Sequence, residues 1–153
     1  MEFTKKGYIA QIAAHLKQKD YEKAYNLAKE LVDKFPGEVA THFILSQAAF
    51  WLGKYDESAK EGRIAFNKST SYDDMLTCTI LTVSAYLESG KVKEGKEMLN
   101  FMENRKSSEE IEKLQFIFSL AAKNEKEAVK HLNDLYEMNH KAAEELVLKY
   151  LKE

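Results

Sequence analysis

Several residue types are scarce in this sequence of 153 residues, and each scarcity excludes a class of protein. One proline and six glycines leave few positions that interrupt a regular backbone. The single cysteine, Cys78, excludes an intramolecular disulfide and a zinc site built from cysteines. A lone cysteine also agrees with a reducing compartment, and we expect it to pack as a small apolar residue.

Long apolar runs and an excess of charge of one sign are also missing. No segment reaches the roughly 20 apolar residues of a membrane span, and the N-terminal segment lacks the apolar run of a secretory signal. The 23 lysines and arginines balance 25 aspartates and glutamates, and both signs are interspersed along the chain. These features disfavour nucleic acid and membranes as partners and predict a soluble, cytoplasmic protein.

What the sequence does contain is a high content of residues that tolerate helical backbone. Hydrophobic residues make up 44% of the chain, which is enough to bury a core and argues against disorder. Apolar residues recur every three or four positions, as in Tyr8, Ile9, Ile12 and Leu16 of the segment 5–17. This spacing puts them on one face of a helix. The chain is therefore predicted to be all-α.

Turn residues divide the chain into successive helices. Gly53 and Gly90 each end an apolar pattern, since glycine accepts the left-handed backbone that stops a helix. Ser71 and Ser107 are each followed three positions later by an acidic residue, as in a capping box at a helix start. The predicted helix hairpins cover residues of about 3–36, 38–68, 72–104 and 108–138, and a capping helix covers about 141–152.

The second helices of these hairpins resemble one another. Residues 19–36, KDYEKAYNLAKELVDKFP, align with residues 53–70, GKYDESAKEGRIAFNKST, and Tyr21 and Tyr55 lie 34 positions apart. Similar starts at residues 90 and 123 follow after 37 and 33 further positions. A period of 34 residues is that of the tetratricopeptide helix hairpin.

On these residues the chain resembles the tetratricopeptide repeat (TPR) family. In that family a small residue three positions after the turn tyrosine lets the paired helices approach closely, and here those positions hold Ala24, Ser58, Gly95 and Ala128. The resemblance covers nearly the whole chain. It implies a single domain over residues 1–153, folded as a right-handed superhelical solenoid of about four hairpins plus a C-terminal capping helix.

Candidate catalytic and metal-binding patterns fail at residues that the chemistry needs. Residues 90–97, GKVKEGKE, match a phosphate-binding loop until Glu97 stands where magnesium requires a hydroxyl. The four histidines form no His-x-x-x-His pair, so we expect them on helix surfaces or partly packed, without a metal. No Gly-x-Ser-x-Gly turn marks a nucleophile. The sequence therefore predicts no enzyme, no cofactor and no metal site.

The remaining functional signal is the apolar surface of the first helix in each hairpin. In the TPR family these helices line a concave groove that holds a peptide or a helix. The resemblance assigns eight residues to that groove, namely Ile9, Ala13, Phe43, Gln47, Phe50, Trp51, Ile80 and Ser84. For Phe50 and Trp51, packing in the core is an alternative of equal weight.

The character of these groove residues indicates the kind of partner. Some family members clamp a C-terminal carboxylate with polar and basic residues, but the matching positions here include Ile44, Thr77 and Leu81. An apolar groove favours an amphipathic helix or an aliphatic segment of another protein. The expected function is therefore a protein-binding scaffold or adaptor. The alternative is a structural subunit that associates with copies of itself.

Overall fold

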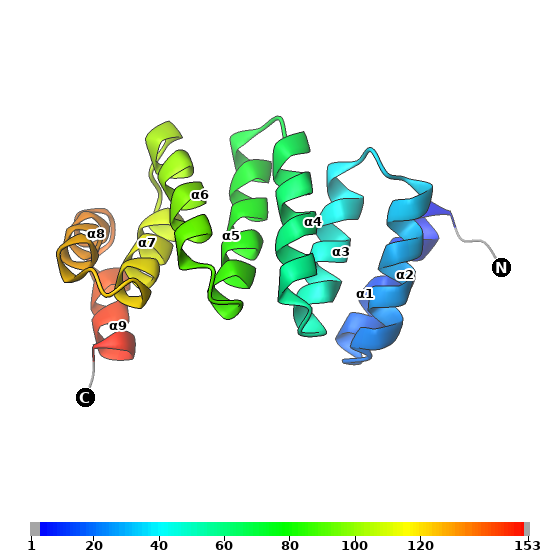
Figure 1. The fold of residues 1–153 in the computed structure, drawn as a ribbon, viewed down its shortest axis with the longest axis horizontal. Coiled ribbons are helices and arrows are strands. Elements are labelled where there is room, and N and C mark those ends of the chain that lie inside the picture. Colours follow the sequence, from blue (N-terminus) through cyan, green and yellow to red (C-terminus); the bar gives the residue numbers. More distant parts are fainter. Residues whose placement is uncertain (1–3, 152–153) are drawn as a thin grey trace. The chain divides into compact units, whose positions relative to one another are not determined.

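The computed structural model describes residues 4–151, in which every regular element is a helix (Figure 1). Contacts divide the chain into two compact units that meet between Ser89 and Gly90. The first unit contains α1 (Lys5–Lys17), α2 (Tyr21–Lys34), α3 (Val39–Trp51), α4 (Tyr55–Lys68) and α5 (Tyr72–Glu88). The second contains α6 (Val92–Arg105), α7 (Glu109–Ala121), α8 (Glu125–Met138) and α9 (His140–Tyr150). The all-α prediction is confirmed for the described residues, and the predicted limits at residues 3 and 152 lie outside them.

In the first unit each helix packs against the next one in sequence, and α3 also packs against α5. The core at the α1 end is built from Tyr8 and Ile12 of α1, Leu31 of α2 and Leu45 of α3, all of them buried, together with small residues. Alanines at positions such as Ala28, with no exposed surface, let the helices approach closely. Burial of these side chains supplies most of the stability of the helices, since short helices are marginal alone.

In the second unit α6, α7, α8 and α9 also pack in sequence order. Its core contains Phe116 of α7, Leu135 of α8 and Leu146 of α9. Each of these helices therefore turns one apolar face toward the core of the unit, as an amphipathic helix does.

The same pattern of buried positions recurs along the chain. The buried positions of α3 recur on α5 after 37 residues and on α7 after a further 33. The four buried positions of α2 recur on α4 after 34 residues. On α3 the recurring buried positions are Thr41, His42, Leu45, Ser46, Ala48 and Ala49. On α5 they are Cys78, Thr79, Thr82, Val83, Ala85 and Tyr86. On α7 they are Ile111, Glu112, Gln115, Phe116, Phe118 and Ser119.

The helix ends follow the predicted chemistry with one correction. Ser71 caps α5 by accepting a hydrogen bond from the backbone N–H of Asp74, and Gly90 has a φ of 76°. The predicted cap Ser107 is wrong by one position, because Ser108 is the residue that accepts from the N–H of Ile111 at the start of α7. Ser107 instead donates to Glu112 at 2.7 Å.

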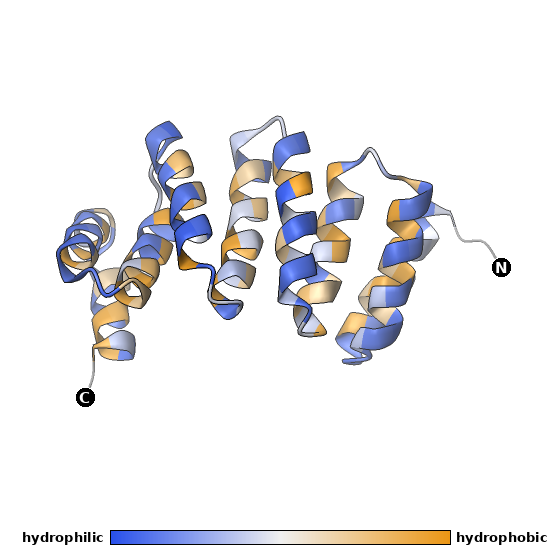
Figure 2. Ribbon diagram, in the orientation of Figure 1, coloured by the Kyte–Doolittle hydropathy of each residue, from blue (hydrophilic) through white to orange (hydrophobic). Residues whose placement is uncertain are grey.

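Polar residues cover the faces that the helices turn away from these cores. Figure 2 shows the visible face of α4 as mostly hydrophilic, and its exposed residues include Asp56, Lys60 and Arg63. Across residues 4–151, no helix combines the length and apolarity that crossing a membrane requires.

Candidate functional site

An apolar hollow lies on the first unit, between α3 and α5. Each helix contributes side chains spaced three or four residues apart, so each presents one stripe to the hollow. The volume is about 310 Å³, and none of the eight lining side chains carries a charge. The lining residues are Phe43, Gln47, Phe50, Trp51, Thr77, Ile80, Leu81 and Ser84.

Aromatic contacts fix one end of this hollow. The Trp51 ring stacks on Tyr21 of α2, with centroids 6.0 Å apart and an angle of 17° between the planes. Phe50 meets the rings of Trp51 and Tyr55 edge-on, at centroid distances of 5.9 and 5.3 Å. Trp51 is nevertheless 54% exposed. Because its ring is already held in place, a partner that covers it loses little side-chain freedom on binding.

A second hollow of about 230 Å³ continues the first toward the start of α3. It shares Phe43 and Thr77 with the first hollow and adds Val39, Ala40, Asp74 and Cys78. Asp74 is the charged member of this set. Together the two hollows follow the 13 residues of α3, which is a length of about 20 Å at 1.5 Å per residue.

The structure brings together six of the eight residues that the sequence assigned to a groove. Phe43, Gln47, Phe50, Trp51, Ile80 and Ser84 all line the hollow between α3 and α5. Ile9 and Ala13 are exposed on α1 and do not line it. Trp51 is not a core residue, and Phe50 is half-buried.

Cys78 packs as expected. It is 2% exposed, and burial raises the pKa of its thiol above the usual value. The thiol is therefore held in its neutral form, which is a poor nucleophile. Its contribution to the second hollow is apolar surface.

Two hairpins contain a buried histidine–glutamate pair with the partners exchanged. In α3 and α4, Nδ1 of His42 lies 2.9 Å from Oε1 of Glu61. In α7 and α8, Nδ1 of His131 lies 2.8 Å from Oε2 of Glu112. His42 and Glu112 occupy the same position of the recurring burial pattern, 70 residues apart, and so do Glu61 and His131. All four are less than 10% exposed.

These pairs correct the sequence-based expectation for two of the histidines. His42 and His131 were expected on surfaces or partly packed, and both are buried against a carboxylate. The partner in each case is 19 residues away on the second helix of the hairpin. Sequence spacing within one helix could not reveal this pairing. The repeat only relates the two pairs to each other, because it maps position 42 onto position 112 and position 61 onto position 131.

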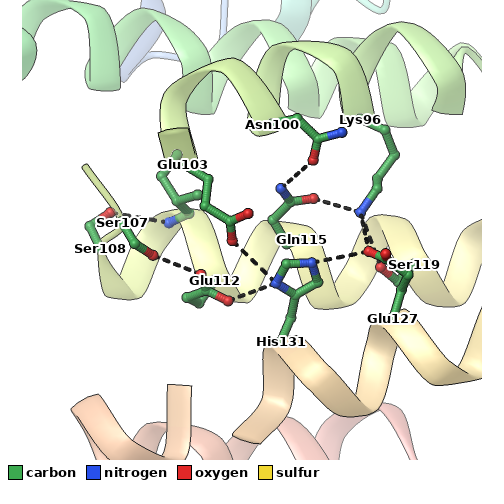
Figure 3. Close-up of polar contacts among 11 residues, drawn as sticks. Lys96, Asn100, Glu103, Ser107, Ser108, Glu112, Gln115, Ser119, Glu127 and His131 are labelled. Carbon is green, nitrogen blue, oxygen red and sulfur yellow. Dashed lines mark hydrogen bonds and ion pairs between the residues drawn. The ribbon is translucent and has the colours of Figure 1, made fainter. Parts of the chain in front are cut away.

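The pair in the second unit belongs to a larger polar cluster (Figure 3). Nδ1 of His131 lies 3.4 Å from Oε1 of Glu103 on α6, in addition to its contact with Glu112. On the other side of the ring, Nε2 lies 3.3 Å from Oε2 of Glu127. The imidazole is thus surrounded by three carboxylates from three helices. We call Glu103, Glu112 and His131 the three-residue cluster.

The electrostatics of this cluster separate its two inner carboxylates. Burial, followed by the neighbouring Glu112, raises the pKa of Glu103. Burial also acts to raise the pKa of Glu112, but hydrogen bonds from His131, Glu103 and Ser107 outweigh it and lower that pKa. One carboxylate is therefore firmly ionised beside the imidazole, while the other is disfavoured as an anion in the absence of a further positive charge.

Comparison with models of protein families and with curated proteins gives no match to the sequence.

Proposed function

We propose that the protein is a binding scaffold of the TPR type, with about four hairpins and α9 as its final helix, wound into a right-handed solenoid. The intervals of 34, 37 and 33 residues between equivalent buried positions support this, because stacked hairpins use the same positions repeatedly. The close-approach residues Ala24, Ser58, Gly95 and Ala128 are all buried.

The uncharged hollow between α3 and α5 is the observation on which binding rests. Trp51 and Ile80 remain 54% and 36% exposed although both are apolar. Contiguous apolar surface of this kind in a soluble protein marks an interaction site, because exposing it to water is unfavourable without a partner. The two hollows together carry no charged lining residue except Asp74.

The shape and charge of the hollow favour an amphipathic helix as its occupant. A length of about 20 Å accommodates roughly 13 helical residues, with apolar side chains at three-to-four spacing facing Phe43, Ile80 and Trp51. Asp74, in the first turn of α5, places a negative charge at one end. A basic residue of the partner at that end would complement it. The partner is therefore a protein segment whose apolar face ends in lysine or arginine.

The same proposal defines what the protein does not do. The scaffold acts through non-covalent recognition in the cytoplasm, without catalysing a reaction and without binding nucleic acid or a membrane. The affinity comes from a few buried apolar anchors and not from net charge, since the formal net charge of the chain is −2.

The proposal is tested with a displayed library of helical peptides, using the full chain as bait. We expect selected peptides to carry apolar residues at three-to-four spacing with a basic residue at one end. Trp51 is the single tryptophan of the chain, so binding is measured directly as a blue shift of its fluorescence. The variant Ile80→Lys places a charge in the hollow and should weaken binding by at least about tenfold.

The matched control is Leu148→Ser on α9. Leu148 is 67% exposed, belongs to the second unit and does not line the hollow. It should bind the selected peptides as the unchanged protein does. Equal loss of binding in both variants, or selected peptides that bind Ile80→Lys normally, would show that the hollow is not the binding surface.

Self-association is the alternative, and exposed apolar residues on α8, on α9 and directly after α9 favour it. Val129, Leu148 and Leu151 are 55%, 67% and 48% exposed. Analytical ultracentrifugation over a range of concentrations separates the two functions. A mass that rises with concentration, and that Leu148→Ser abolishes, supports self-association, whereas a constant monomer mass excludes it.

A further inference from the structure

The three-residue cluster of the second unit has the composition of a metal site. One nitrogen and two carboxylate oxygens, from His131, Glu103 and Glu112, lie within 4.8 Å of one another. Each comes from a different helix, α8, α6 and α7, so the packing of the unit and not one flexible loop holds them together. Two of the three residues are 1% exposed, which separates them from ordinary surface acids.

One buried oxygen of this cluster accepts no hydrogen bond from the described part of the chain and is held by a long ion-pair contact. Oε1 of Glu103 is buried and accepts no hydrogen bond within the described residues. It lies 3.4 Å from Nδ1 of His131, on the side where Glu112 is also found. A buried carboxylate that accepts no hydrogen bond at this oxygen is disfavoured as an anion, and a cation placed among these atoms would stabilise its ionised form.

The surrounding groups orient the cluster in the way that outer residues of metal sites do. Glu127 lies 3.3 Å from Nε2 of His131, so Nε2 can donate to a carboxylate while Nδ1 faces Glu103 and Glu112 (Figure 3). Ser107 donates to the second oxygen of Glu112 at 2.7 Å. Lys96 lies 3.6 Å from Glu127 and donates to Gln115 and Ser119, which fixes the outer carboxylate in turn.

A hollow connects the cluster with solvent. Its volume is about 360 Å³, and it is lined by Glu103 and Glu112 together with Ser107, Lys130, Asp134, Glu137 and Met138. The lining has four acidic residues against one base, Lys130, so its net charge is negative and favours the approach of a cation. An ion therefore has a route to the carboxylates of Glu103 and Glu112, which contact His131, and a water molecule in the hollow could be a fourth ligand.

We propose that Glu103, Glu112 and Nδ1 of His131 bind one divalent transition-metal ion of the zinc type. Imidazole nitrogen combined with carboxylate oxygen suits Zn²⁺ and Co²⁺, whereas Mg²⁺ and Ca²⁺ take oxygen ligands. Ligand atoms about 2.0–2.2 Å from a tetrahedral ion lie roughly 3.3 Å apart. The observed separations from Nδ1 are 2.8 and 3.4 Å, and all three ligand atoms lie within 4.8 Å of one another, so side-chain shifts without movement of the helices would form the site.

Binding exchanges protons for the metal at two defined groups. The hydrogen between Nδ1 of His131 and Glu112 leaves to solvent, and the nitrogen lone pair takes up the ion. The hydrogen on Nε2 stays and is donated to Glu127. A proton held by the Glu103 carboxyl leaves to solvent in the same way, since burial and Glu112 raise the pKa of that group. No bonds other than these N–H and O–H bonds are broken, and no oxidation state changes.

The chain contains its own comparison site in the first unit. His42 and Glu61 form the same buried pair, but Nε2 of His42 lies 2.6 Å from the carbonyl oxygen of Pro36. Within the described residues, the cluster around His131 is a group of three metal-binding side chains that lie close together. The pair of His42 and Glu61 belongs to no such group. The pair of the first unit should therefore bind no metal.

The test is calorimetric titration of the full chain, freed of metal with a chelator, with Zn²⁺ and separately with Co²⁺. We expect one ion per chain, weaker binding at lower pH, and the visible absorption of tetrahedral Co²⁺. The variants Glu103→Gln and Glu112→Gln should lose at least about 100-fold in affinity, and Glu127→Gln about tenfold. Glu61→Gln is the matched control and should bind as the unchanged protein does.

Glu103→Gln is the decisive variant, because it removes a ligand without breaking the pair of His131 and Glu112. Its thermal unfolding in the presence of chelator should occur at the same or a higher temperature than that of the unchanged protein. Normal Zn²⁺ affinity in a folded Glu103→Gln chain overturns the proposal. So does the absence of stoichiometric Zn²⁺ binding to the unchanged chain, or an equal loss of affinity in Glu61→Gln.

Discussion

Two glycines, Gly62 on α4 and Gly95 on α6, occupy positions where a side chain has no room. A Cβ atom at Gly95 would overlap the buried ring of Phe118, and one at Gly62 would overlap the side chain of Thr82. Both glycines are therefore required by packing, although glycine in a helix interior costs about 1 kcal/mol relative to alanine. Packing against Phe118 accounts for Gly95, so no phosphate-binding role is needed to explain why residues 90–97 partly match a phosphate-binding loop.

We predict that Gly95→Ala lowers the free energy of unfolding by about 1–3 kcal/mol, even though alanine favours the helix. The reason is that Phe118 is fully buried and cannot move aside without displacing its neighbours. The measurement is urea unfolding followed by circular dichroism. Gly37→Ala is the control, because nothing lies within 4 Å of the added Cβ. It should be neutral or stabilising by up to about 1 kcal/mol, and a similar loss in both variants would contradict the packing argument.

At the scale of the helix hairpin, the same pair of buried positions holds histidine and glutamate in either order. The histidine is on the first helix in α3 and α4 and on the second helix in α7 and α8. These positions need two groups that satisfy each other away from water, and either helix can supply the histidine. For His42 and Glu61 we predict that each single alanine variant destabilises the protein by about 3–5 kcal/mol, because it leaves the other group buried without a partner. The double variant should lose about 1–3 kcal/mol less than the sum of the two.

A double-mutant cycle by urea unfolding measures this coupling. The control is a second cycle on Lys5 and Glu38, which also form an ion pair but whose side chains are 44% and 40% exposed. That exposed pair should show a coupling below about 1 kcal/mol. Additive losses for His42 and Glu61, within about 0.5 kcal/mol, would mean that the two side chains are buried independently of each other.

The helices were predictable from the sequence and the polar pairs were not. Periodicity and glycine positions indicate where helices run and end, because these signals act within a few residues. Of the eight residues that the resemblance assigned to a groove, the six on α3 and α5 lie together around one hollow, whereas Ile9 and Ala13 on α1 do not line it. Their role in binding stays a prediction. Ser107 shows the limit of this reasoning, because two adjacent serines satisfy the same capping pattern and only the packing of Glu112 decides between them. The cluster around His131 depends on three helices at once.

At the scale of the whole molecule, each unit has helices with neighbours on several sides and helices at an edge. In the first unit α3 packs against α2, α4 and α5, whereas the main packing of α1 is against α2. In the second unit α7 packs against α6 and α8, whereas the main packing of α9 is against α8. Because opening an edge helix exposes fewer apolar contacts, the two kinds of helix should differ in local stability.

We predict that this difference appears in hydrogen exchange. Backbone amides in the centre of α3 should exchange more than about tenfold slower than those of α1, and amides of α7 should exchange similarly slower than those of α9. Exchange followed by mass spectrometry of proteolytic peptides resolves each helix. The comparison is made within each unit, so it does not depend on how the units are arranged. Equal protection of α1 and α3 would mean that the first unit opens as one cooperative block, because its edge helix would then be as costly to release as its central one.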